Sequence, residues 1–222
     1  MCGRFALFTP ASKIAEIFDA IEPLEVAPRW NVPPTDAIVA VIANDAGVRR
    51  LGLVRWGLVP FFLKDKKGPP LINARAETLL TKPTFRSAFA SRRCLVPADG
   101  FYEWEKVGKE RRGWFICRKD REPFAMAAIY ETIKDDAGAR SGSAAVITCE
   151  ANELVAPIHD RMPVILPRPA WVGWLDRADH DAEHWLAQLK PFPGGEMLRY
   201  RVGPLVNSVV NDTPECAVEV PC

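Results

Sequence analysis

Short apolar-rich runs separated by turn residues recur along the chain and predict a protein built mainly from β-strands. Two such runs, 36–43 and 48–56, are joined by Asn44-Asp45-Ala46-Gly47, whose composition suits a hairpin turn. The same pattern predicts further strands at 4–8, 94–97, 101–107, 114–118, 124–130, 144–149, 162–166 and 198–202. The first of these strands begins directly after Cys2 and Gly3.

Helical spacing of apolar residues is confined to a few short segments. Thr9-Pro10 is a helix-start signal, and Ile14, Ile17 and Phe18 follow at helical intervals. Further helices are predicted at 84–93, 151–158, 169–175 and 181–190. Because these helices do not alternate regularly with the strands, as βαβ units would, we expect an α+β fold with a mostly antiparallel sheet.

The size of the chain suits one domain. Its 222 residues are 48% apolar, which is ample for a full core, and no internal linker is apparent, so we expect a single domain over residues 1–222. No run of about eighteen apolar residues occurs, and charged Arg4 follows Gly3 at once, so we expect a soluble, cytoplasmic protein. Six scattered cysteines are typical of free thiols in a reducing compartment.

The net charge of the chain is too small to create a positive field over the whole protein. The chain carries 29 Lys and Arg residues against 28 Asp and Glu residues, so its formal charge is +1. A nucleic-acid site would therefore be a local arginine groove, for which Arg92-Arg93 and Arg111-Arg112 are the visible clusters. A solvated surface is the simpler interpretation of either pair.

Cys2 is a candidate nucleophile because removal of Met1 would place an α-amine and a thiol on one residue. An α-amine is partly neutral at pH 7 and condenses with an aldehyde to an imine, and the neighbouring thiol then closes a five-membered thiazolidine ring. No cofactor is needed for this adduct. The alternative is an inert, buried cysteine, which describes most cysteines in proteins.

Two segments carry polar residues that a strand-rich core does not require. If extended, residues 73–77 point Asn73, Arg75 and Glu77 to one face that could hold a sugar-phosphate, unless Arg75 and Glu77 merely pair. Glu103 lies among aromatic residues in 101–104, where burial would raise its pKa toward the range useful for proton transfer. Strand alternation could instead leave Glu103 in solvent, and Glu105 on the same face is its competitor.

The histidines suggest one candidate catalytic site and one motif that only resembles a zinc site. His159 and Arg161 lie at a predicted helix-to-strand junction, where they could move protons and bind phosphate. Residues 180–184 match the His-x-x-Glu-His zinc pattern, but the motif straddles a predicted helix start, so we expect no metal. Cys-x-x-Cys, Walker, G-x-G-x-x-G and G-x-S-x-G motifs are absent, and we expect no cofactor.

Four ordered motifs resemble those of the SOS-response-associated peptidase (SRAP) family. They are Met1-Cys2-Gly3-Arg4, the segment 73–77, the segment 97–104 and the segment 159–163. The resemblance extends through 56–60, 84–89 and 206–207 and so covers essentially the whole chain, although 181–196 shows no feature that aligns. Their order and spacing make the four motifs far more specific together than singly.

The resemblance implies a barrel-like β domain with flanking helices and a positively charged groove for single-stranded DNA. Cys2 would cross-link to abasic sites as a thiazolidine after Met1 is removed, shielding the lesion from strand cleavage. Asn73 would orient the reacting end, Glu103 would act as acid and base, and His159 would assist proton transfer. Further residues match family positions that touch DNA, namely Arg4, Arg75, Arg86 and Arg161, with Trp56 and Pro60 as an apolar wedge. We expect a monomer that associates with the nucleoid when bound to DNA.

Two other functions remain open at this point. Glutamine amidotransferases can also begin Met-Cys-Gly and use the freed cysteine against an amide, but they are usually joined to a synthase domain, for which 222 residues leave no room. A non-covalent single-strand binding module with an inert Cys2 is the third candidate. Covalent glutamine-analogue labelling would identify the amidotransferase, and complexes that dissociate on denaturation would identify the binding module.

Overall fold

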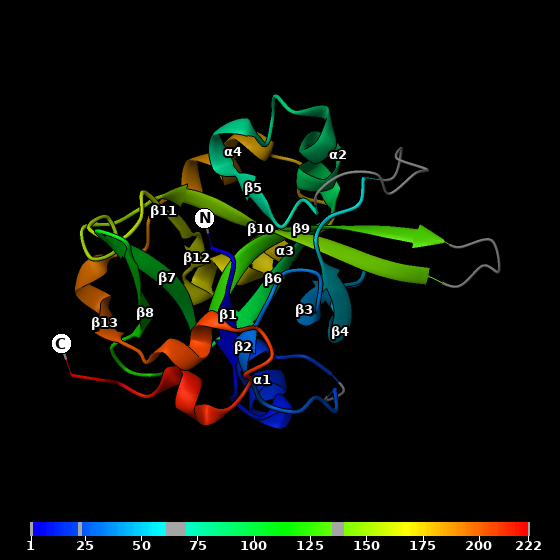
Figure 1. Ribbon diagram of the computed structural model, residues 1–222. Helices are drawn as coiled ribbons and strands as arrows, with labels where there is room; N and C mark the ends of the chain where they lie inside the picture. Colours follow the sequence, from blue (N-terminus) through cyan, green and yellow to red (C-terminus); the bar gives the residue numbers. More distant parts are fainter. Residues whose placement is uncertain (1, 22–23, 61–69, 135–139, 222) are drawn as a thin grey trace.

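Five strands close into a β-barrel at the centre of the molecule (Figure 1). The computed structural model describes residues 2–21, 24–60, 70–134 and 140–221. Around the barrel the strands are β4 (Arg49–Trp56), β3 (Ala37–Ala43), β6 (Arg93–Ala98), β9 (Phe124–Lys134) and β10 (Arg140–Glu150). β10 closes the ring because it pairs with β9 along one edge and, in parallel, with β4 along the other. The mostly antiparallel α+β expectation is confirmed.

Strand β10 also carries the elements that hold candidate site residues. Beyond its contact with β4 it pairs with β5 (Asn73–Arg75) in parallel, and its last residues pair with β11 (Arg161–Pro163). β12 (Ile165–Leu166) continues onto β9. The register places Asn73 opposite Val146 and Arg161 opposite Glu150. Two motifs that lie far apart in sequence therefore meet at one end of a single long strand.

A second, antiparallel sheet packs beside the barrel. Its strand order is β13 (Met197–Arg201), β8 (Glu110–Arg118), β7 (Gly100–Val107), β1 (Phe5–Leu7) and β2 (Arg29–Val32). Phe5 pairs with Phe101 and packs edge-on against the ring of Trp56, which connects the two sheets. Gly100 is required at the start of β7, because a Cβ there would lie 2.1 Å from the Phe115 ring.

Four short helices cover the outside of the sheets: α1 (Ala11–Phe18), α2 (Pro83–Ser91), α3 (Trp171–Leu175) and α4 (Ala182–Gln188). Aromatic contacts attach α1 to α3, since Phe18 stacks on Trp171 with 4.3 Å between ring centroids. Single 3-10 turns fill the connections: η1 (Ala76–Thr78), η2 (Arg168–Ala170), η3 (Gly194–Glu196), η4 (Pro204–Asn207) and η5 (Pro214–Ala217). Among the described residues, no helix is long and apolar enough to cross a membrane.

One predicted helix, 151–158, is wrong. The segment forms successive turns instead, beginning at the buried Asn152. The Asn152 side-chain oxygen accepts from the backbone N–H groups of Leu154 and Val155, while its amide donates to Phe192 O at 2.7 Å. These contacts cap the first turn, as at a helix start, but the turns do not continue as a helix.

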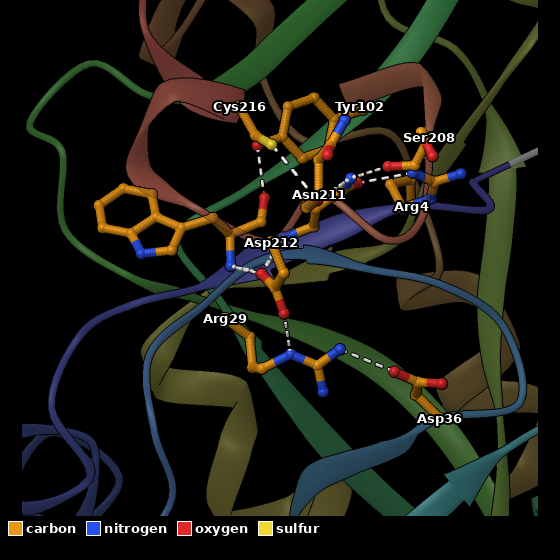
Figure 2. A network of polar contacts seen from close by, with 10 residues as sticks. Arg4, Arg29, Asp36, Tyr102, Ser208, Asn211, Asp212 and Cys216 are labelled. Atoms are coloured by element: carbon orange, nitrogen blue, oxygen red, sulfur yellow. Dashed lines mark hydrogen bonds and ion pairs between the residues drawn. The ribbon is translucent and has the colours of Figure 1, made fainter. Parts of the chain in front are cut away.

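The C-terminal segment is fastened across β2 by polar contacts rather than by a strand (Figure 2). The Asp212 carboxylate accepts from the Arg29 guanidinium and from the backbone N–H groups of Trp30 and Asn31. Asn31 is fully buried and donates to the carbonyls of Ser208 and Asn211. These contacts hold η4 and the residues after it beside the start of β1.

Candidate functional site

Cys2 is completely buried at the entrance to β1. Its carbonyl accepts a 2.8 Å hydrogen bond from Asn73 Nδ2. Burial raises the pKa of its thiol far above the ordinary value, and the negative charge of Glu103 acts in the same direction. The backbone N–H of Arg4 opposes this effect weakly. At neutral pH the sulfur is therefore a protonated thiol, and a nearby base must take its proton before it can attack.

Asn73 brings β5 into contact with the start of the chain. The residue is half-buried, and its Nδ2 donates to Cys2 while its Oδ1 is buried without a hydrogen-bond partner among the described residues. A buried amide oxygen that accepts nothing is costly unless another donor reaches it. The Asn73 side chain therefore fixes the backbone of Cys2 and retains one acceptor for a group that arrives from outside.

Glu103 lies in the middle of β7 and is only 4% exposed. Burial raises the pKa of its carboxyl group above the ordinary value, and the charge of His159 partly offsets this effect. The sequence-based preference for Glu103 over Glu105 is supported by geometry, since Glu105 is half-buried and accepts from Trp114 Nε1 at 3.1 Å. A carboxyl group with a raised pKa can both donate and accept a proton near neutral pH.

His159 ends the turns that precede β11. The backbone N–H of Arg161 donates to its Nδ1 at 2.9 Å, and a carboxylate oxygen of Asp160 lies 2.9 Å from the same nitrogen. The His159 side chain is 27% exposed. Since His159 acts electrostatically on Glu103, and Glu103 on Cys2, the four candidate catalytic residues gather in one place.

The side chain of Arg4, two residues after Cys2, belongs to a network of polar contacts (Figure 2). Its Nη1 donates to Asn31 Oδ1 at 2.6 Å and to Val206 O at 2.8 Å. Its guanidinium lies 5.5 Å from the centre of the Trp104 ring. Burial lowers the pKa of Arg4. Its Nε is buried and has no hydrogen-bond partner among the described residues. Arg4 therefore keeps one donor for a group from outside, two residues along the chain from Cys2.

The other predicted DNA-binding arginines differ in how available they are. Arg161 is 11% exposed, donates to both carboxylate oxygens of Glu77 at 2.7 and 2.9 Å, and donates to Thr148 O. The expectation that Arg75, Asn73 and Glu77 share one extended face is wrong, because β5 ends at Arg75 and Glu77 lies in η1. The simpler pairing of Arg75 with Glu77 is also absent, since Arg161 occupies that carboxylate. Arg75 and Arg86 are exposed.

The predicted apolar wedge does not lie on the surface. Trp56 is completely buried, its Nε1 donates to Ile72 O at 2.9 Å, and its ring packs on Phe5. Pro60 is also buried and is the last described residue before the 61–69 gap. The ring of Trp56 thus presents no surface to a DNA base. It is part of the hydrophobic core instead.

The zinc-like motif does not form a ligand cluster. His184 lies in α4, whereas His180 precedes that helix and its Nδ1 lies 3.2 Å from Ala90 O. No group of three His, Cys, Asp or Glu side chains in the described part of the chain is arranged to hold a metal ion. Free, buried thiols are found at Cys2, Cys94, Cys117, Cys149 and Cys216.

Three further residues complete the surroundings of Arg4, and among them Arg111 belongs to an arginine pair that the sequence had already indicated. Trp104 donates from Nε1 to Asn207 Oδ1 at 2.7 Å, and the Arg111 guanidinium lies 5.9 Å from the same indole ring. Together with Arg4 they line a surface hollow of about 300 Å³. Trp104 directly follows Glu103 in the sequence, within the 97–104 motif. Asn207 belongs to a segment more than 100 residues away along the chain.

Comparisons with known proteins identify one family. Residues 1–209 match the SOS response associated peptidase (SRAP) family. The chain is 42% identical to the abasic site processing protein YoqW of Bacillus subtilis over 220 residues, covering 97% of this chain and 98% of that protein. It is 35% identical to the abasic site processing protein YedK of Escherichia coli, covering 79% of each.

A solved structure supports the fold independently. A protein from Bacteroides thetaiotaomicron superimposes with a TM-score of 0.88 at 25% identity, covering 99% of this chain and all of that one. The family match extends from the first residue through the C-terminal segment that holds Arg4, so it includes all of the candidate site residues. The chain belongs to the SOS response associated peptidase (SRAP) family.

Proposed function

We propose that this protein processes abasic sites in single-stranded DNA by bonding to them covalently through Cys2, after removal of Met1. An abasic deoxyribose opens to an aldehyde at C1′, and this electrophile is absent from intact DNA. A free α-amine and a thiol on one residue capture an aldehyde without a metal or an organic cofactor. The amine is free only when Met1 has been cleaved, so the active species begins at Cys2.

The proposed reaction of Cys2 with the abasic sugar has two steps. The α-amine of Cys2 adds to C1′ and expels the aldehyde oxygen as water, which leaves an imine. The Cys2 sulfur then bonds to the same carbon, its proton passes to a base, and the imine nitrogen is protonated to the ring amine of a thiazolidine. The oligonucleotide and the protein are joined with the net loss of one water molecule.

Each neighbouring residue has a role in these steps. Glu103 in its protonated form donates to the sugar ring oxygen as the ring opens and to the departing water, and as carboxylate it accepts the thiol proton. Asn73 orients the Cys2 backbone through its 2.8 Å hydrogen bond. His159, whose side chain is 27% exposed, exchanges protons with solvent. Arg4 holds a phosphate next to the reacting sugar.

The observation that carries the proposal is the convergence of Cys2, Asn73 and Glu103 from three separate elements around the start of the chain. A non-covalent binding module would not need a buried carboxyl group with a raised pKa beside an N-terminal cysteine. The names of the relatives point to the same substrate, since both YoqW and YedK are abasic site processing proteins. A monomer is sufficient for this chemistry because all of these residues come from one chain.

Intact mass spectrometry under denaturing conditions tests the proposal directly. Wild-type protein incubated with single-stranded DNA carrying one abasic site should give a species whose mass equals the protein without Met1, plus the oligonucleotide, minus one water. Cys2→Ala and Cys2→Ser both retain the α-amine and lack the thiol, so without reduction they should give no stable adduct. Borohydride reduction should trap the imine of either variant. A normal stable adduct with Cys2→Ala would overturn the proposal.

Two controls separate the competing functions. An oligonucleotide with a tetrahydrofuran spacer, which cannot open to an aldehyde, should bind and give no adduct. A covalent glutamine analogue should leave Cys2 unlabelled, whereas labelling would indicate an amidotransferase. If the complexes with every abasic substrate dissociate on denaturation, the protein binds DNA only non-covalently.

A further inference from the structure

Thr148 places a hydroxyl group at a completely buried position of β10. Its Oγ1 has no hydrogen-bond partner among the described residues. A buried hydroxyl without a partner destabilises a protein, and valine has nearly the same shape without that cost. Packing alone therefore does not account for a threonine at this position.

Strand pairing places the Thr148 side chain on the face of the sheet that carries Asn73. Parallel pairing of β10 with β5 sets Thr148 opposite Arg75, two positions along from Asn73. Paired residues of neighbouring strands point to the same face, and so do alternate residues of one strand. Asn73 and Thr148 therefore project from one face, with about 8 Å between their Cα atoms from strand geometry.

The two faces of β10 differ in what they meet. Ile147 and Cys149 alternate with Thr148 and pack into the hydrophobic core. The face that carries Thr148 runs from the buried Val146 to the exposed Glu150 at the end of the strand. Thr148 thus lies where the buried part of this face meets the surface.

The backbone of Thr148 is fixed on both sides. β5 pairs with it along one edge, and β11 pairs with it along the other, where Pro163 lies opposite. Arg161 Nη2 donates to the Thr148 carbonyl at 2.7 Å, and the same guanidinium binds Glu77. A donor held in this way needs no reorganisation when a substrate binds, which is the condition for electrostatic stabilisation of a reacting group.

Two buried side-chain oxygen atoms on this face lack a partner in the described part of the chain. They are Asn73 Oδ1, which can only accept, and Thr148 Oγ1, which can donate as well. The Nδ2 of the same Asn73 holds the carbonyl of Cys2 at 2.8 Å. The two oxygen atoms suit one ligand oxygen, which donates to Asn73 when it is a hydroxyl and accepts from Thr148 in every form.

We propose that Thr148 is a further catalytic residue, whose hydroxyl donates a hydrogen bond to the oxygen on C1′ of the abasic sugar. This inference rests on the proposed function, in which C1′ is the atom that Cys2 attacks. In the closed sugar this oxygen is a hydroxyl and donates to Asn73 Oδ1. In the open form it is the carbonyl oxygen, on which negative charge builds as the amine adds. The Thr148 hydrogen bond stabilises that charge until the oxygen is protonated and leaves as water.

The same contact distinguishes the lesion from intact DNA. An intact nucleotide has a base nitrogen on C1′, where the abasic sugar has a hydroxyl. That nitrogen has no hydrogen to give to Asn73 Oδ1, and both buried oxygen atoms are left without a partner. A site built to hydrogen-bond a hydroxyl rejects a ligand that lacks it.

Thr148→Val and Thr148→Ser separate the hydroxyl from packing. Single-turnover cross-linking to single-stranded DNA with an abasic site measures the rate, and thermal unfolding measures Tm. Thr148→Val removes the hydroxyl and keeps the shape, so the rate should fall at least about tenfold while Tm stays at or above that of the wild type. Thr148→Ser keeps the hydroxyl and removes a methyl group, so the rate should stay within about threefold while Tm falls.

Ser143→Ala is the matched control on the same strand. Ser143 is also buried, but it lies on the opposite face of β10 and its Oγ accepts from Val59 N at 3.0 Å. Its hydroxyl therefore has a structural partner. The substitution should lower Tm and leave the cross-linking rate unchanged.

A second substrate locates the contact of Thr148. An oligonucleotide with an acyclic aldehyde, made by periodate cleavage of a vicinal diol, has the carbonyl oxygen and lacks the sugar ring. Because the proposed contact is to the carbonyl oxygen, Thr148→Val should slow the reaction of this aldehyde by the same factor as that of the abasic sugar.

The outcomes separate this inference from the proposed function. An unchanged rate in Thr148→Val, or an equal loss of rate in Thr148→Ser, would overturn the role of the hydroxyl. A loss confined to the abasic sugar would also overturn it, because the contact would then be to another oxygen of the nucleotide. Absence of cross-linking with wild-type protein would overturn the proposed function itself.

Discussion

Asn73 Nδ2 donates to the carbonyl oxygen of Cys2 at 2.8 Å, which ties the start of the chain to β5. The two residues lie 71 positions apart, and β5 is held in place by its parallel pairing with β10. The segment that carries the proposed nucleophile lies at a chain end, which is the part of a protein most prone to disorder. This hydrogen bond converts a terminus into a positioned group.

Asn73→Asp should slow adduct formation about tenfold, because an ionised carboxylate has no proton to donate to the Cys2 carbonyl and repels it. The rate is measured by quenching into denaturant and separating free from cross-linked DNA. Asn44→Asp is the matched control: Asn44 Oδ1 accepts from two backbone N–H groups in an exposed turn, a role that aspartate retains. An unchanged rate in Asn73→Asp would remove Asn73 from the positioning of Cys2.

Glu103→Gln should slow adduct formation and also stabilise the protein at neutral pH. Burial raises the pKa of Glu103, so the folded state binds its proton more tightly than the unfolded state does. Stability is therefore fullest below the ordinary value of 4.5 and falls as pH rises through the higher folded pKa, by about 1.4 kcal/mol for each unit between the two. Glutamine carries no charge and avoids this loss.

Urea unfolding at several pH values measures this effect. The difference in unfolding free energy between Glu103→Gln and wild type should be largest at neutral pH and vanish toward pH 4. Glu105→Gln is the matched control on the same strand and face. If Glu105→Gln slows the reaction and Glu103→Gln does not, the acid and base role belongs to Glu105.

Local sequence signals were sufficient for most of the fold but not for contacts made across long separations. The hairpin 36–56 and the strands after it follow from apolar spacing and turn residues, which are local. β2 (Arg29–Val32) was not predicted, because its backbone is held by Asp212, about 180 positions away. The helix predicted at 151–158 is present only as successive turns, and apolar spacing does not distinguish the two.

The candidate site shows the same division. Cys2, Asn73, Glu103 and His159 were identified from their motifs, and the structure brings them together. The burial of Trp56 could not be predicted from the sequence. The residue ends an apolar strand, and that pattern is the same whether its ring faces the core or the solvent. Arg111 belongs to a visible arginine pair and Asn207 to a segment of the family resemblance, but they meet beside Trp104 only because η4 and the β7–β8 hairpin come together.

Trp56→Phe should keep cross-linking within about twofold of wild type while lowering the unfolding free energy by about 1 to 3 kcal/mol. The change removes the hydrogen bond to Ile72 O and part of the buried ring, but keeps an aromatic group against Phe5. Thermal unfolding and single-turnover cross-linking measure the two effects. A large loss of cross-linking with unchanged stability would instead indicate that Trp56 contacts DNA.

Glu77→Gln tests whether Arg161 serves DNA or the fold. Both guanidinium Nη atoms of Arg161 are occupied by the Glu77 carboxylate, whose pKa is lowered by that contact. Removing the charge of Glu77 frees Arg161 and deletes a negative charge close to Arg75, so affinity for single-stranded DNA should rise about threefold or more at low salt. The cost to stability should be at most about 1 kcal/mol, because Glu77 is half exposed.

Anisotropy titrations at low and high salt measure this gain, which should shrink as salt screens the phosphates. The gain should also disappear at acid pH, since protonation neutralises Glu77 in the wild type once pH falls below its lowered pKa. Glu16→Gln is the matched control, because Glu16 pairs with Lys13 on α1, at the opposite end of the molecule from β5 (Figure 1). A fall in affinity in Glu77→Gln would mean that the ion pair positions Arg161 for DNA rather than withholding it.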